Sequence, residues 1–133
     1  MDTLLIPADD VVQITVTAYL PLEVRRLAEA LIGQGLASDV YTMPAGHLSR
    51  RWWDTQSDSA DPDNTGGAST ELRAYLVTIR TTIRLAEQVA QLASTILEQE
   101  YLDIMVLPVA GGDHTYLNAV REALDGRTPE SSP

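Results

Sequence analysis

Residues 11–33 read VVQITVTAYLPLEVRRLAEALIG and contain the patterns of a strand followed by a helix. Apolar residues occupy every second position at the start, at Val12, Ile14 and Val16. This period of two, rich in β-branched side chains, is typical of a β-strand. Pro21 suits the first turn of a helix, and apolar residues then recur at helical spacing, at Val24, Leu27, Ala28 and Leu31. The stretch therefore predicts a strand over 11–18 and a helix over 21–33.

Further strand and helix patterns follow in the middle of the chain. Residues 36–43 form a second β-like run, which Pro44-Ala45-Gly46 ends. Residues 71–81 predict a third strand with apolar side chains on both faces: Leu72, Ala74 and Leu76 on one, and Tyr75, Val77 and Ile79 on the other. Residues 82–97 predict an amphipathic helix, with apolar positions at Ile83, Ala86, Val89, Ala90, Ala93, Ile96 and Leu97.

The C-terminal part predicts one more strand and one more helix. Residues 101–109 are a nearly continuous apolar run of strand length, and Gly111-Gly112 is interpreted as a turn. Asp113 is a good N-cap for a short helix, and Gly126 stands just past its end. The residues expected on the inner face of this helix are Tyr116, Leu117, Val120, Ala123 and Leu124.

The order of these elements predicts an α+β fold of the ferredoxin-like, split βαβ type. It contains a four-stranded antiparallel sheet, two crossover helices and a C-terminal helix. Two crossover helices cover only one face of such a sheet, yet the third and fourth strands are apolar on both faces. We therefore expect a second copy of the chain to cover the other face, which makes the protein an oligomer.

Length and composition are those of one globular domain. The chain has 133 residues, of which 44% are hydrophobic, enough to build a core. We expect an N-terminal extension at 1–10, a single domain over 11–126 and a flexible tail at 127–133. Residues 56–69 are small, polar or acidic, and this composition predicts a mobile loop inside the domain.

Charge and cysteine content exclude several functions. Nine basic against nineteen acidic residues give a net charge of −10, which disfavours binding to a phosphate backbone, so no nucleic-acid partner is expected. The chain has no cysteine, and therefore no thiolate metal site, disulfide or cysteine nucleophile. No apolar run is long enough to cross a bilayer, and the N-terminus does not resemble a secretory signal. We expect a cytoplasmic protein with no membrane partner.

Three stretches resemble the CutA family, small trimeric proteins with a PII-like, ferredoxin-like fold that are linked to divalent cation tolerance. The first runs from Leu36-Ala37-Ser38-Asp39-Val40-Tyr41-Thr42-Met43-Pro44 to Trp52. The second starts at Glu71 and ends at Ile79-Arg80-Thr81. The third is Ile104-Met105-Val106-Leu107-Pro108-Val109, followed by Gly111-Gly112 and Tyr116-Leu117. The resemblance implies the CutA fold and a homotrimer, with clefts between subunits.

The sequence also departs from the family pattern. Asp39 stands where the family has its best copper-binding candidate, a cysteine. The family's histidine-containing stretch before the last strand is replaced by residues 98–103, and residues 56–69 are an insertion in what is usually a tight hairpin. We therefore expect no metal site. A divalent cation tolerance function, with metal held by carboxylates, remains an alternative.

The candidate ligand-binding residues are few and scattered. Arg50, Arg51, Trp52 and Trp53 combine two cations with two large aromatic rings, which could hold an anionic or aromatic ligand. The alternative is that Trp52 packs against a neighbouring subunit. The two histidines, His47 and His114, lack metal-ligand spacing, and solvated loop positions are the simpler interpretation. Arg80, where the family has a lysine, is explained by an edge salt bridge. The candidate set is completed by Tyr101, Asp103 and Tyr116.

No motif specifies a reaction, so catalytic residues and cofactors stay unassigned. Two pairs, Ser49 near His47 and Asp103 with Glu100, could serve in acid–base catalysis, but neither has a motif context. We therefore expect a homotrimeric, CutA- or PII-like protein that binds a small ligand or regulates a partner. The alternative is an enzyme or biosynthetic accessory protein on the same trimer.

Overall fold

The computed structural model describes residues 4–47, 72–99 and 101–125. Its main sheet has four antiparallel strands in the order β3-β4-β2-β5. These strands are β2 (Val11–Ala18), β3 (Asp39–His47), β4 (Leu72–Thr82) and β5 (Met105–Pro108). Helix α1 (Pro21–Gly33) lies between β2 and β3 in the chain, and α4 (Ala86–Ile96) lies between β4 and β5. The predicted ferredoxin-like split βαβ fold is confirmed.

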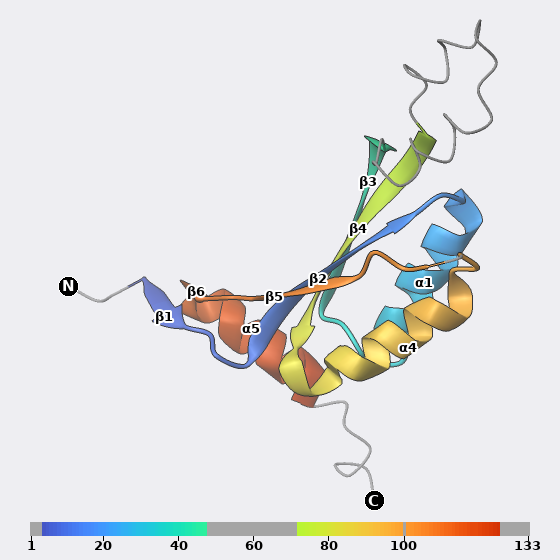
Figure 1. The fold of residues 1–133 in the computed structure, drawn as a ribbon. Helices are drawn as coiled ribbons and strands as arrows, with labels where there is room; N and C mark the ends of the chain where they lie inside the picture. The colour runs from blue at the N-terminus through green and yellow to red at the C-terminus, as the bar shows by residue number, and fades with distance from the viewer. Residues whose placement is uncertain (1–3, 48–71, 100, 126–133) are drawn as a thin grey trace, which may run out of the picture.

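The register between strands places the alternating apolar residues on one face of the sheet. Ile14 of β2 lies opposite Ile79 of β4, which in turn lies opposite Val40 of β3. Directly opposite residues point to the same side of a sheet. Helices α1 and α4 cover this side (Figure 1). The core between the layers contains fully buried side chains from both: Ile14, Val16, Val77 and Ile79 from the sheet, and Leu27, Leu31, Val89 and Ala93 from the helices.

Two strands differ from the prediction by more than one residue. The second strand is Asp39–His47, not 36–43, because Leu36 lies in the turn that ends α1: its N–H bonds back to the Leu31 carbonyl of the helix at 2.9 Å. The last strand is only Met105–Pro108, not 101–109, because the ladder with β2 ends at Thr15. Beyond that point the N–H of Thr17 bonds to the Asp103 carboxylate at 2.8 Å, in place of a backbone carbonyl.

The helices also differ in detail from the prediction. The second one begins with a 3-10 turn, η1 (Ile83–Leu85), in which Ile83 is 54% exposed, so its place on the inner face was wrong. Helix α5 (His114–Asp125) buries Leu117, Val120 and Leu124 as predicted. Ala123, expected inside, is exposed. No helix in the described part of the chain is long and apolar enough to cross a membrane.

A second, two-stranded sheet was not predicted. Strand β1 (Leu5–Pro7) pairs with β6 (Gly111–Asp113), beside α5 and away from α1 and α4 (Figure 1). The interpretation of Gly111 and Gly112 as turn glycines was therefore wrong. Gly111 permits the pairing, because a Cβ there would lie 2.6 Å from the carbonyl oxygen of Ile6.

The face of the main sheet that is turned away from α1 and α4 is largely exposed. We call this surface the open face and define it by Tyr41, Met43, Leu76, Met105 and Leu107, which are 36% to 60% exposed. Helix α5 covers only the end of the face near Val11, which is buried in the same cluster as Leu117. The strands at the two edges of the sheet, β3 and β5, have mostly exposed residues.

Candidate functional site

Arg80 lies near the end of β4, where residues of three other elements converge on it. The register places it opposite Gln13 of β2 and Asp39 of β3, so that all three side chains share the open side of the sheet. Helix α5 contributes Tyr116 and β3 contributes Tyr41. We call these five residues the Arg80 cluster; the structure places it where α5 meets the open face.

Neutral groups hold the Arg80 guanidinium in place. Its Nε donates to Gln13 Oε1 at 3.2 Å, and its Nη1 donates to the hydroxyls of Tyr116 at 3.1 Å and Tyr41 at 3.5 Å. The guanidinium carbon also lies 4.8 Å from the ring centroid of Tyr41 and 5.7 Å from that of Tyr116, within the range of cation–π contacts. The expected edge salt bridge of Arg80 is not found among the described residues, where the hydrogen-bond partners of the guanidinium are uncharged.

The Tyr116 hydroxyl joins the cation to a carboxylate. It accepts the hydrogen bond from Arg80 and donates one to Asp39 Oδ2 at 2.5 Å. The Ser38 hydroxyl also approaches this oxygen, at 3.1 Å. Burial raises the pKa of Tyr116 above its ordinary value, and the bond to Asp39 raises it further, since both disfavour the phenolate. Tyr116 therefore remains a neutral bridge between two charges at ordinary pH.

The start of α5 determines where Tyr116 points. Asp113 acts as the predicted N-cap: its Oδ2 accepts the Tyr116 N–H at 3.0 Å, three residues into the helix. The same helix then buries Leu117 and Val120 against the core. Because the cap and the buried face both fix the rotation of α5, the protein itself holds the Tyr116 ring beside Arg80.

A second group of predicted residues lies at the other end of the open face. His47, the last residue of β3, stacks on Tyr19, with ring centroids 5.7 Å apart, and its Nδ1 is hydrogen-bonded to the Tyr19 hydroxyl. Burial raises the pKa of Tyr19, and the charges of Asp103 and Tyr101 raise it further. His47 is thus a half-buried, hydrogen-bonded residue, and its assignment as a solvated loop histidine was wrong.

The candidate residues therefore do not form one site. Arg80 and Tyr116 come together, as do His47, Tyr101 and Asp103, the latter three around Tyr19. His114 is exposed, and its Nδ1 contacts only the neighbouring Thr115 hydroxyl, at 3.2 Å, among the described residues. Arg50, Arg51, Trp52 and Trp53 lie outside the described residues, as does the predicted loop 56–69.

The candidate list missed four residues: Gln13, Tyr19, Asp39 and Tyr41. Asp39 and Gln13 are the cross-strand neighbours of Arg80, and a correct register would have found them. For Asp39 there was a signal, because it replaces a functional residue of the resembling family. For Tyr19, which follows β2, we see no signal in the sequence.

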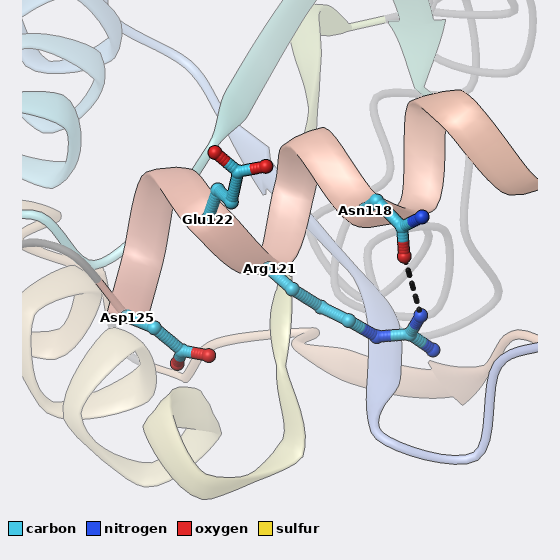
Figure 2. Close-up of a pocket in the computed structure, with 4 residues that line it drawn as sticks. All are labelled: Asn118, Arg121, Glu122 and Asp125. Atoms are coloured by element: carbon cyan, nitrogen blue, oxygen red, sulfur yellow. Dashed lines mark hydrogen bonds between the residues drawn. The ribbon is translucent and has the colours of Figure 1, made fainter.

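A hollow of about 470 Å³ lies elsewhere, along the outer side of α5 (Figure 2). Asn118, Arg121, Glu122 and Asp125 line it. Its charged groups are largely paired within the protein: Arg121 bonds to Asp10 at 2.8 Å and to Asn118 at 3.4 Å, and Asp125 pairs with Arg84 at 3.0 Å. These bonds join α5 to the segment between β1 and β2 and to η1, which is a structural role.

Comparisons with solved structures identify the fold class. A CutA protein from Synechococcus elongatus aligns with 90% of this chain and 95% of its own, with a TM-score of 0.73 and 20% identity. The same protein in complex with Bis-Tris gives a TM-score of 0.72 and 19% identity over 90% and 99% of the two chains. The periplasmic divalent cation tolerance protein CutA of Archaeoglobus fulgidus gives 0.70 and 17% over 86% and 98%.

The fold is thus that of the CutA proteins, and the resemblance found in the sequence is confirmed at this level. No protein-family model and no curated protein matches the chain. The identities to the solved structures are low, so these comparisons establish the fold of the chain.

Proposed function

We propose that the chain is a CutA-like protein that assembles as a homotrimer and binds a small ligand at the Arg80 cluster, in clefts between subunits. The observation that carries this proposal is the position of the cluster. A fixed guanidinium and a carboxylate lie at the border of an exposed apolar sheet face. A second subunit on that face would turn the border into a cleft.

The open face supports self-assembly. Met43 is 55% exposed and Met105 is 60% exposed, and both belong to an exposed apolar patch of the kind that marks an interaction surface. Burying them gains about 25 cal/mol for each Å² removed from water. Strands β3 and β5 also leave backbone groups at the sheet edges, which pair readily with another strand. A closed ring of identical copies satisfies both surfaces at once.

The Arg80 cluster supports ligand binding more than a purely structural role. Arg80 is half-buried, and its orientation is set by three hydrogen bonds before any ligand arrives. An arginine fixed in this way loses little entropy when it binds a negatively charged group. The cluster also lies at the end of the open face, where a neighbouring subunit would exclude water and strengthen the interaction.

The donor set of the cluster does not fit a divalent cation. Oδ2 of Asp39 already accepts hydrogen bonds from Tyr116 and Ser38, and the permanently charged Arg80 is its cross-strand neighbour. Among the described residues there is no group of three or more histidine, aspartate or glutamate side chains arranged for a metal. We therefore do not propose for this chain the divalent cation tolerance that appears in the names of solved CutA structures.

Light scattering combined with a thermal-shift screen tests the proposal. We expect a particle of three times the 14.5 kDa of one chain, and a Leu76→Asp variant that dissociates because it places a charge in the interface. The control is Leu22→Asp, an apolar residue that is 67% exposed on α1, away from the open face. The screen contains nucleotides, carboxylates, amines including Bis-Tris, and divalent metals. A stable monomer at micromolar concentration would refute the assembly.

A further inference from the structure

We propose that the ligand of the Arg80 cluster is a small zwitterion, a molecule that carries a protonated amine beside a carboxylate, as free α-amino acids do. This inference rests on the ligand-binding function proposed above and narrows it. The residues that carry it are Arg80 and Asp39, which are direct partners in the register of β3 and β4. A bare anion fits these two residues poorly, because one of them carries a negative charge.

The two charges lie side by side on the same surface. Directly opposite residues of antiparallel strands have their Cα atoms only about 4.5–5.5 Å apart and point to the same face. An anion that approaches Arg80 therefore meets the repulsion of Asp39, and a cation that approaches Asp39 meets that of Arg80. A zwitterion of matching orientation is attracted by both. Both residues are half-buried, so solvent screens these interactions less than on an open surface.

The hydrogen bonds of the cluster keep the charges of Arg80 and Asp39 apart and fix their orientation. The Tyr116 hydroxyl stands between them, as acceptor from Arg80 at 3.1 Å and donor to Asp39 at 2.5 Å. The described residues contain no ion pair between Asp39 and Arg80 that would neutralise both groups directly. The charges are therefore linked through a neutral group, and each can still attract an opposite charge of the ligand.

The remaining hydrogen-bonding capacity of both groups matches the proposed ligand. The contacts with Gln13, Tyr41 and Tyr116 use Nε and Nη1 of the guanidinium, and among the described residues no bond involves Nη2. The bonds to Asp39 from Tyr116 and Ser38 both involve Oδ2, and within the described ranges none involves Oδ1. A carboxylate can bind at Nη2 and an ammonium group at Oδ1.

A comparison of charge-deleted ligands tests this inference on the unmodified protein. The probes are the free α-amino acids that occur in proteins, screened by thermal shift and calorimetry at millimolar concentration. For the best one, the N-acetyl derivative lacks the positive charge and the amide derivative lacks the negative charge. We expect each derivative to bind at least about tenfold more weakly than the amino acid itself. A factor of ten corresponds to about 1.4 kcal/mol in binding free energy.

Two variants test which residue recognises which charge of the ligand. Asp39→Asn should remove most of the penalty against the N-acetyl derivative, and Arg80→Gln most of the penalty against the amide. The matched controls are Glu29→Gln and Arg25→Gln, from the exposed ion pair on α1, and they should leave both ratios unchanged. The measurements on the unmodified protein remain decisive if either cluster variant fails to fold.

The outcomes separate this inference from the proposed function. If simple carboxylates, or the N-acetyl derivative, bind as tightly as the amino acid and need Arg80, the zwitterion inference is wrong and the ligand-binding function stands. If no compound of the whole screen binds, both are wrong. If an amino acid binds with its selectivity unaffected by Asp39→Asn and Arg80→Gln, the assignment to this cluster is wrong.

Discussion

The Tyr116 hydroxyl donates a 2.5 Å hydrogen bond to Asp39, although the two residues are 77 positions apart in the sequence. One residue belongs to the C-terminal helix and the other begins an edge strand. The bond thus joins α5 to the sheet at the place where Arg80 is held. The same hydrogen-bond network therefore fixes both the orientation of α5 and the positions of the charged groups in the candidate site.

Replacing this hydroxyl should therefore destabilise the protein. Tyr116→Phe removes the donor to a carboxylate and the acceptor of Arg80, and we expect a loss of about 1–2 kcal/mol in the free energy of unfolding. Urea denaturation measures the loss. Tyr41→Phe is the matched comparison and should cost clearly less, because among the described residues the Tyr41 hydroxyl has only a 3.5 Å bond, from Arg80. Equal losses in both variants would contradict the central position of Tyr116.

The Tyr116 phenol should titrate above the ordinary tyrosine pKa of about 10. Burial raises its folded-state pKa first, and Asp39 raises it further, so the folded state favours the protonated form. The stability from this group is complete below the unfolded-state pKa and is lost as the pH rises through the folded-state value. Ultraviolet difference titration of the wild type against Tyr116→Phe isolates this step. Asp39→Asn should move the pKa down, and an unchanged pKa would argue against the bond.

The ion pair of Asp10 with Arg121 predicts a dependence of stability on acid pH. The hydrogen bond from Arg121 lowers the pKa of Asp10 below its ordinary value of 3.8. Its stabilising effect is therefore present above that value and disappears as the pH falls through the folded-state pKa. Asp10→Asn should be less stable than the wild type at neutral pH, with the difference closing in acid. Thermal unfolding at several pH values measures it, and Glu98→Gln, at an exposed position outside this ion pair, is the control.

The pairing of β1 with β6 should depend on the absence of a side chain at Gly111. Gly111→Ala would place its Cβ 2.6 Å from the Ile6 carbonyl oxygen, so the strands must separate. We expect a loss of about 1–3 kcal/mol, typical of steric overpacking. Gly33→Ala is the opposite control, because nothing lies within 4 Å of its added Cβ, and alanine favours helix by up to about 1 kcal/mol. If Gly111→Ala is tolerated equally well, the β1–β6 pairing contributes little.

Copper and zinc should not raise the melting temperature of the protein. Asp39 accepts two hydrogen bonds and lies beside Arg80, and the Nδ1 of His47 is hydrogen-bonded to Tyr19. Each residue would have to give up these protein partners to bind a metal. Calorimetry with each metal is the measurement. A stoichiometric, submicromolar site that a His47→Ala, His114→Ala double variant loses would overturn this expectation.

Local sequence patterns predicted much of this fold for a simple reason. The alternation of Val12, Ile14 and Val16, and the buried stripe of α5, reflect which side of each element leaves water, and this depends on neighbours a few residues away. The N-cap at Asp113 is equally local, since donor and acceptor are three positions apart. Element order then limits the topology to few choices.

Only the tertiary structure decided which distant groups meet. The partners of Arg80, the pairing of Tyr19 with His47 and the β1–β6 ladder each join residues at least 28 positions apart. Such contacts depend on strand register and helix rotation, which are set by packing of the whole core, and many registers are compatible with the same alternation. The sequence by itself thus determined the order of the main strands and helices and most of their buried faces, while the charged and aromatic site emerged only when those faces were packed together.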